Sequence, residues 1–174
     1  MDEPTTPYQA ALLGQTATIY HLHSVDEYRD IASRLATQAS RSLSLLSRDL
    51  EPLVFNQPPF IEAVKQLALN TRIARIRILL QDNSLVRTQG HRLIDLAQRL
   101  TSTIEIRKPG RESVDIAETF LIADDCGYLH RQLADRYEAM VCFNDHLRTN
   151  QLEERFTEIW ERGEPDIEMV RLHL

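Results

Sequence analysis

The sequence predicts an α/β fold in which a mixed β-sheet is flanked by helices. Segments with helical periodicity alternate with short runs of β-branched and aliphatic residues, and no internal repeat interrupts the pattern. The length of 174 residues is that of one ordinary domain with a single core. We therefore expect residues 1–15 to form an irregular arm and residues 16–174 to form one domain.

The first half of the chain is predicted to contain two strands and two helices. They are a strand at 16–22, a helix at 24–39, a strand at 42–48 and a helix that begins at Pro58 and Pro59. Ser24 and Glu27 have the spacing of a capping box, which marks the start of the first helix. In 42–48 leucines alternate with serines, which predicts a half-buried strand, and Pro52 is expected in the loop after it.

The second half is predicted to be richer in strands. Strands are expected at 75–81, 103–107, 116–123 and 137–143, with a hairpin partner at 128–132, and helices at 85–100 and 145–162. Asp124, Asp125, Cys126 and Gly127 form the predicted hairpin turn, and Asp145 caps the last helix. Phe156, Ile159 and Trp160 lie on one face of that helix, which predicts that they pack in the core. The tail at 165–174 resembles a short extended segment that docks on an edge of a sheet.

Composition excludes several classes of protein. The formal net charge of −6 disfavours a general nucleic-acid coat. Cys126 and Cys142 are too few for a disulfide framework or a zinc finger, and are expected to be buried hydrophobes. The glycines form no phosphate-binding loop. His21 and His23 share a face of a predicted strand, but nothing spaced near them completes a metal site, so we expect no metal and no cofactor. With no apolar stretch long enough for a membrane span, a cytoplasmic protein is predicted.

Residues 72–111 carry an excess of cations, whereas the rest of the chain is acidic. This segment is the natural place for an anion site. The candidate ligand-binding residues are Arg75, Arg77, Arg87, His91, Arg92, Arg107 and Lys108. Arg87 and His91 are four residues apart and would share a face of the predicted helix. The segment has no aromatic residue on which bases could stack, so any binding of nucleic acid is expected to be weak.

From Pro59 onward the chain resembles one half of the phospholipase D superfamily fold. The resemblance rests on the order of a helix (PFIEAVKQLAL), a strand (RIRILLQD), a helix (GHRLIDLAQRL), a strand (IEIR), a strand ending in paired acids (FLIADD), a strand (YEAMVCF) and a helix ending FTEIWERG. It covers about two thirds of the chain, and residues 42–48 would add the first strand of the sheet. The resemblance implies a phosphodiester-binding fold.

In active members of that superfamily, a histidine attacks phosphorus, a lysine two residues later binds the phosphate oxygens, and an aspartate follows five residues after the lysine. Placing Asp124 on that aspartate puts Ala117 at the histidine position and Thr119 at the lysine position. The Gly-Ser-x-Asn segment of active members is also missing, with Arg131, Gln132, Leu133 and Ala134 in its place. Alanine cannot form a phosphohistidine and threonine carries no charge, so the resemblance implies loss of catalysis of this type.

Three functions remain open. The first is a non-catalytic protein-interaction or regulatory module, with a protein partner or a second copy of the chain, because single-half members of the superfamily pair two halves across their site. The second is phosphate or nucleic-acid binding through residues 72–111. The third is an enzyme of unrelated chemistry that uses Asp124, Asp125 and His130. The two aspartates are also residues that commonly fix a tight turn, which favours the first function over the third.

Overall fold

The structure is a computed structural model that describes residues 6–113, 115–133 and 135–171. The strands are β1 (Ile19–Leu22), β2 (Ser42–Ser47), β3 (Arg75–Leu80), β4 (Ile104–Lys108), β5 (Thr119–Ala123), β6 (Gly127–Arg131), β7 (Ala139–Cys142) and β8 (Glu164–Pro165). The helices are α1 (Val25–Gln38), α2 (Pro52–Phe55), α3 (Pro58–Asn70), α4 (Ser84–Gln89), α5 (Arg92–Arg99), α6 (His146–Arg162) and α7 (Ile167–Val170), with a 3₁₀ turn at Arg111–Ser113. None of the helices in these ranges is both long and apolar enough to cross a membrane.

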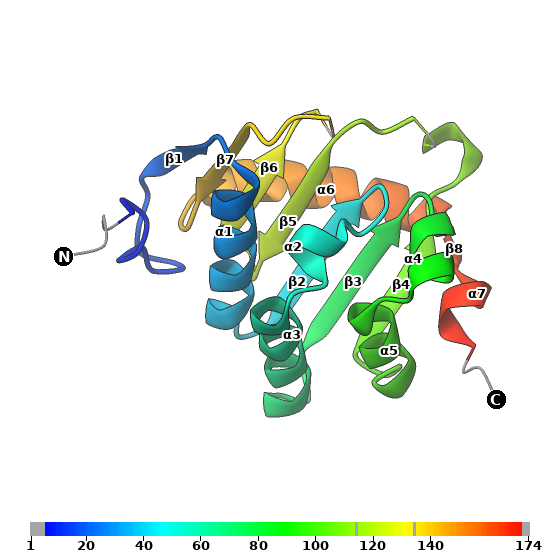
Figure 1. The fold of residues 1–174 in the computed structure, drawn as a ribbon. Helices are drawn as coiled ribbons and strands as arrows, with labels where there is room; N and C mark the ends of the chain where they lie inside the picture. The colour runs from blue at the N-terminus through cyan, green and yellow to red at the C-terminus, as the bar shows by residue number, and fades with distance from the viewer. Residues whose placement is uncertain (1–5, 114, 134, 172–174) are drawn as a thin grey trace.

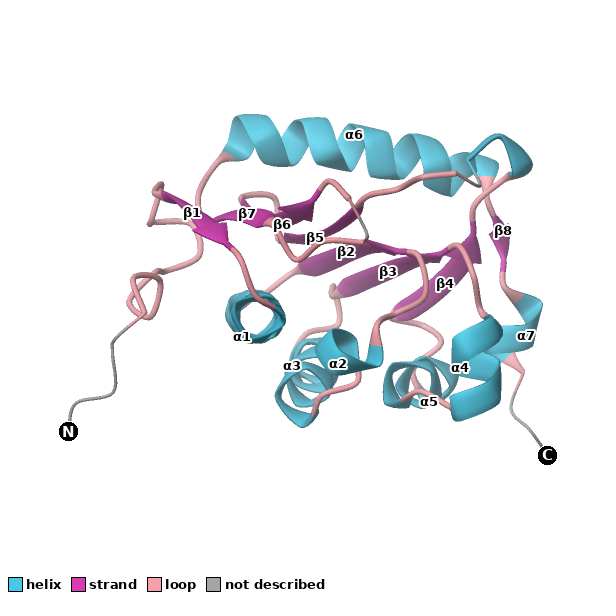
Figure 2. Cartoon of the chain, turned by 45° about the horizontal axis from the view of Figure 1, so that its top comes forward, coloured by secondary structure: helices cyan, strands magenta, loops and turns pink. Residues whose placement is uncertain are grey.

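The strands form one mixed sheet, as the sequence predicts. Their order is β1-β7-β6-β5-β2-β3-β4-β8, with β2, β3 and β4 parallel and the remaining neighbours antiparallel. The long helix α6 covers one face of the sheet, and the other helices lie on the opposite face or at its edge (Figures 1 and 2). The ends of β2, β3 and β4 therefore lie at the same edge as the start of β5 and the end of β6.

Two apolar clusters hold the layers together. The larger one joins α1, α2, α3 and α5 to side chains such as Leu45, Ile78 and Leu121 on one face of the central strands. The smaller one packs α6 through Phe156 and Trp160 onto the other face. Phe156, Ile159 and Trp160 are all buried, which confirms that this stripe belongs to the core.

The start of the chain follows the prediction in part. Ser24 and Glu27 form the expected capping box of α1. The strand β2 is buried on both faces rather than half-buried, because α6 covers its serine side as well. Pro52 does not lie in a loop but begins α2, since a helix tolerates proline in its first turn. From the expected irregular arm, Tyr8 and Ala11 pack into the core, while residues 1–5 lie outside the described residues.

The helix predicted at 85–100 is wrong, because the chain forms two helices there. Gly90 has a φ of 73°, a left-handed conformation that ends α4. His91 then caps α5 by accepting a hydrogen bond from Leu93 N on its ring. The apolar residues of α4 and α5 keep a helical spacing across this break, so the periodicity alone did not show it.

Several strands are shorter than predicted, with β5 beginning at Thr119 and β7 at Ala139. The β5–β6 hairpin and the Asp145 cap of α6 are confirmed. The C-terminal tail pairs with the sheet edge through β8 and then turns into α7, so it is not extended throughout. Residues 172–174 of that tail lie outside the described residues.

Candidate functional site at the ends of the central strands

Asp124 fixes the turn between β5 and β6, as its position after a strand predicts. Its φ of 56° is in the left-handed region, which aspartate adopts more readily than most residues. Its carboxylate accepts hydrogen bonds from the backbone N–H groups of Ser40, Arg41 and Ser42, at 2.8–3.2 Å. Asp125 pairs with the Arg41 side chain at 2.8 Å. The paired acids therefore hold this turn against the start of β2.

At the other end of the hairpin, Thr119 and Arg131 are direct cross-strand partners. Thr119 is 0% exposed and Arg131 is 1% exposed, whereas Ala117 is exposed before β5 begins. The guanidinium of Arg131 donates both terminal nitrogens to Glu51, with an Nη1 to Oε2 distance of 3.1 Å. The position that the superfamily resemblance assigns to a phosphate-binding lysine thus lies beside a buried ion pair.

Two tyrosines enclose the Glu51–Arg131 ion pair. The Arg131 Cζ lies 5.0 Å from the centre of the Tyr28 ring and 5.1 Å from that of Tyr137, distances at which a cation is attracted to an aromatic face. Burial opposes the charge of Arg131, but its hydrogen bonds to Glu51 prevail and raise its pKa. Burial also raises the pKa of Tyr28, so its hydroxyl stays protonated.

Three buried polar atoms around this pair make no hydrogen bond within the part of the chain that the structure describes. They are Tyr28 Oη, Thr119 Oγ1 and Arg131 Nε. Buried polar groups without a partner are uncommon and costly. This end of the hairpin is therefore buried, and its polar groups are only partly satisfied.

A second charged cluster lies on the opposite face of the same two strands, beneath α6. His130 Nε2 is 2.7 Å from Glu118 Oε2, and both side chains are at most 10% exposed. Arg148 Nη2 lies 3.1 Å from His130 Nδ1. Arg155 Nη2 is 2.6 Å from Glu118 Oε1, in an ion pair whose angle is poor for a hydrogen bond.

Donor and acceptor chemistry assigns the proton of His130. A guanidinium only donates, so Nδ1 must accept from Arg148, and the proton lies on Nε2, which donates to Glu118. Burial of Glu118 favours its neutral form, but the hydrogen bond from His130 and the charge of Arg155 outweigh it and lower the pKa of the carboxyl. In this arrangement the carboxylate is ionised and the imidazole is neutral.

The seven candidate residues of the basic segment do not meet at one site. Arg77 is buried beneath α6, where it pairs with Glu153 and lies over the Phe156 ring. Arg107 donates to Trp160 O, and its Cζ lies 4.6 Å from the Trp160 ring centre. Both arginines thus stabilise the packing of α6.

The other members of the set lie on different surfaces. Arg87 pairs with Glu168 of α7 at 3.2 Å. Arg75, Arg92 and Lys108 are exposed, at the start of β3, the start of α5 and the end of β4. The continuous helix expected to carry Arg87 and His91 is broken at Gly90, although both residues line one hollow between α4, α5 and α7.

His91 is buried, and both of its ring nitrogens make hydrogen bonds within the fold. It is 3% exposed, and its Nε2 lies 2.9 Å from Leu50 O while Nδ1 accepts from Leu93 N. Both ring nitrogens are thereby occupied. Burial lowers the pKa of His91, which opposes the positive charge that anion binding would need.

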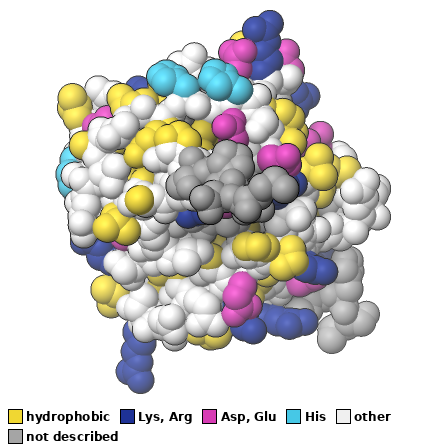
Figure 3. Space-filling view, turned by 60° about the vertical axis from the view of Figure 1, so that its left-hand side comes forward, with side chains coloured by type: hydrophobic (Ala, Val, Ile, Leu, Met, Phe, Trp, Pro, Cys, Tyr) yellow, Lys and Arg dark blue, Asp and Glu magenta, His cyan; other side chains and the backbone are white. Residues whose placement is uncertain are grey.

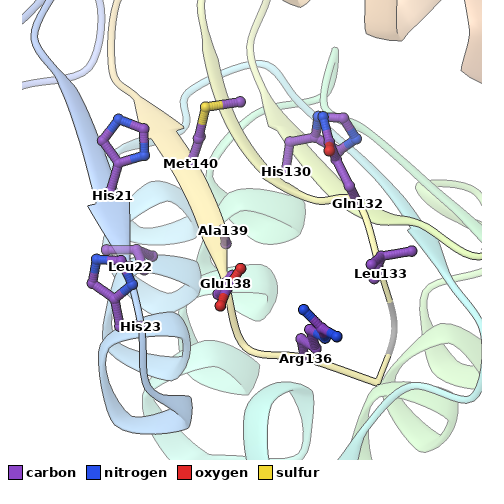
Figure 4. Close-up of a pocket in the computed structure, with 10 residues that line it drawn as sticks. All are labelled: His21, Leu22, His23, His130, Gln132, Leu133, Arg136, Glu138, Ala139 and Met140. Carbon is purple, nitrogen blue, oxygen red and sulfur yellow. The ribbon is translucent and has the colours of Figure 1, made fainter.

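Three of the histidines line one hollow of about 240 Å³ on the α6 face of the sheet (Figure 4). His21 and His23 come from β1 and the residue after it, and His130 comes from β6. Among the described residues, no group of three or more His, Cys, Asp or Glu side chains could hold a metal ion. Cys126 and Cys142 are both buried and unpaired with each other, as expected of small hydrophobes.

The Glu51–Arg131 pair was not predicted, although the sequence held a signal for it. Arg131 lies two residues after Leu129 in β6, so the two side chains share the inward face of the strand. A charged side chain at such a position requires a buried partner. The identity of that partner, 80 residues away, depends on where α2 begins.

Comparison with known proteins gives a family and a fold. A family model described as "Domain of unknown function (DUF7931)" matches residues 24–172. No curated protein matches the sequence.

Several solved structures share the fold at low sequence identity. Nuc from Salmonella typhimurium, a phospholipase D family member, aligns with a TM-score of 0.60 at 15% identity over 85% of this chain and 97% of its own. NucT from Helicobacter pylori aligns with a TM-score of 0.63 at 11% identity over 85% and 98%. These likenesses show that the fold is phospholipase D-like.

A third similar structure is that of a DNA-binding protein. TrmBL2, an archaeal chromatin protein with a novel mode of DNA binding, aligns with a TM-score of 0.64 at 21% identity over 91% of this chain. The aligned chain spans 57% of the length of TrmBL2. At this identity the likeness concerns the fold alone.

Proposed function

We propose, for a chain that belongs to the family described as "Domain of unknown function (DUF7931)", that it is a non-catalytic phospholipase D-like domain that acts as a protein-interaction module. A shared fold does not carry a shared function, so the proposal rests on the site. Its partner in this proposal is a second copy of the chain.

One observation carries the proposal: the Glu51–Arg131 ion pair fills the end of the β5–β6 hairpin. The resemblance to active members assigns a nucleophilic histidine to position 117 and a phosphate-binding lysine to position 119. This chain has alanine and a fully buried threonine there. Among the described residues whose contacts are given above, Arg131 is the cation beside Thr119. Its two terminal nitrogens already donate to Glu51.

The rim of this filled site supports an interaction role. Leu53 lies two residues after Glu51 and is 58% exposed, and Leu133 lies two residues after Arg131 and is 50% exposed. Each leucine is thus two residues along the chain from a member of the ion pair, and Leu133 also lines the hollow that His130 borders. Exposed apolar side chains that form one patch mark a surface that a partner can cover.

The experiment is sedimentation velocity of the whole chain over a range of protein concentrations. The proposal predicts a reversible dimer that Leu53→Asp with Leu133→Asp weakens at least tenfold. Leu69→Asp is the matched control, since Leu69 is 56% exposed but lies on α3. A chain that stays monomeric at high concentration, or a control that weakens the dimer equally, contradicts the proposal.

A second candidate function is nucleic-acid binding through the basic segment, favoured by the shared fold with a chromatin protein described as binding DNA. Its cations are dispersed, and Arg77 and Arg107 are engaged by α6. The test is a titration of labelled single-stranded DNA at low salt with wild type and with Arg87→Ala combined with Arg92→Ala. Tighter binding by wild type with a steep salt dependence would support this function, and equal or absent binding would refute it.

A further inference from the structure

The hollow beside His130 is built from two rows of side chains that cross the sheet. His21, Met140 and His130 are consecutive partners on β1, β7 and β6, and all three side chains face the α6 layer. His23, Glu138 and Gln132 line the hollow beyond that row. Figure 4 shows His21 and His23 across from His130, with Met140 and Glu138 between them.

The side of the molecule that carries β1 presents histidines at its surface, two of them next to each other (Figure 3). Imidazoles are the side chains whose charge ordinarily changes between pH 5 and 8. At neutral pH the charged residues that line the hollow are Arg136 and Glu138, which offset each other. Protonation of the histidines would make the hollow strongly cationic.

Of the three imidazoles that line the hollow, His130 is the one for which contacts with charged side chains are described above. Glu118 from the segment before β5 accepts from Nε2, while Arg148 from α6 donates to Nδ1. Arg155 from α6 pairs with the far oxygen of Glu118. On the side of β1 and β7, the titratable groups that line the hollow are His21, His23 and Glu138. Adding a proton to Nδ1 would place an N–H against the guanidinium of Arg148, two donors facing each other.

We propose that this hollow binds a small oxyanion when His130 is protonated, and that the contact of Arg148 with Nδ1 opposes this protonation. When His130 takes up a proton from solvent, Arg148 must leave Nδ1, and the imidazolium N–H becomes free to donate to an anion. Arg136, at the edge of the hollow, supplies a second cation. The site lies on the α6 face of β6, so it is separate from the filled site on the other face and does not rest on the proposed function.

The probe is inorganic sulfate, because its charge is constant between pH 5.5 and 8.0. Titration calorimetry of wild type should give at least about tenfold tighter binding at pH 5.5 than at pH 8.0, because imidazoles ordinarily gain their charge within this range. His130→Gln should lose most of this pH dependence. His146→Gln is the matched control, since His146 is exposed in the first turn of α6 and outside the hollow, and it should behave as wild type.

The role of Arg148 is tested separately with Arg148→Met, which removes the donor that opposes protonation of Nδ1. Sulfate binding by this variant should reach half of its maximum at a higher pH than in wild type. Nitrogen NMR of His130 at pH 8.0, without sulfate, should find the proton on Nε2. The inference is overturned by any of these results: no sulfate binding at pH 5.5, equal affinity at both pH values, full pH dependence in His130→Gln, or an unchanged midpoint in Arg148→Met.

Discussion

The strands β5 and β6 carry a charged cluster on each face, and the two clusters differ in how they are closed. On one face the Glu51–Arg131 pair lies between Tyr28 and Tyr137, with Arg131 only 1% exposed. On the other face the Glu118–His130 pair is also buried, but its outer partners reach solvent, since the Arg155 side chain is 55% exposed.

The two clusters therefore differ in whether they include an imidazole beside a hollow: the Glu51–Arg131 pair does not, and the Glu118–His130 pair does. The first cluster is an ion pair enclosed by two aromatic rings. A neutral imidazole held between a carboxylate and a guanidinium beside a hollow can change its charge. The same two strands therefore carry one charged cluster enclosed by aromatic rings and a second, also buried, beside a hollow.

The largest expected effect is on the enclosed pair. Glu51→Ala leaves Arg131 buried without a counter-charge, which costs about 3 to 5 kcal/mol of unfolding free energy. Urea unfolding at pH 7 measures the loss. Glu51→Leu combined with Arg131→Met should recover most of it, because two apolar groups replace two charges. A loss below about 1 kcal/mol for Glu51→Ala, or no recovery in the double variant, would contradict a buried ion pair that depends on both partners.

A smaller effect is expected in the second cluster. Glu118→Gln keeps the size of the side chain but removes its charge, so it should lose the excess strength of a charged over a neutral hydrogen bond, about 1 kcal/mol at pH 7. Because the pKa of Glu118 is lowered in the folded protein, its contribution is complete above the ordinary pKa of a glutamate and is lost as the pH falls below it.

The stability difference between wild type and Glu118→Gln should thus shrink when urea unfolding is repeated below about pH 4.5. Glu161→Gln, exposed on α6, serves as the control with no change at either pH. A difference that stays constant or grows in acid would show that the charge of Glu118 does not stabilise this cluster.

The smallest effect is expected at the solvent-exposed end of the second cluster. Arg155→Met should cost about 0.5 kcal/mol, because an ion pair with one exposed partner is largely screened by water and salt. Urea unfolding at low and high salt measures it, and the loss should be smaller at high salt. A cost as large as that of Glu118→Gln would mean that the second cluster is as tightly closed as the first.

The fold was predictable because its signals are local. Ser24, Pro58 and Asp145 mark helix starts, and the alternation of β3 and β6 marks strands. The break at Gly90 was missed since α4 and α5 share one apolar periodicity, so the predicted relation of Arg87 to His91 failed with it.

The candidate site was less predictable because its contacts are long-range. The resemblance aligned Ala117, Thr119 and Asp124 with the catalytic motif of the superfamily. The sequence also indicated that Asp124 and Asp125 fix a turn, as they do. It also grouped the arginines of residues 72–111 by proximity in the chain, yet alternation in β3 and β4 sends Arg77 and Arg107 beneath α6. The partners Glu51 with Arg131 and Glu118 with Arg155 follow only from the packing of α2 and α6 against the sheet.

The most direct test of the account is a phosphodiesterase assay of the purified chain with bis(p-nitrophenyl) phosphate in the presence of EDTA. The proposal of a non-catalytic domain rests on the resemblance that assigns Ala117 to the position of the histidine nucleophile. We predict no hydrolysis above the buffer blank for the wild type. Hydrolysis that co-purifies with the protein and is lost in a folded Thr119→Val variant would contradict the account.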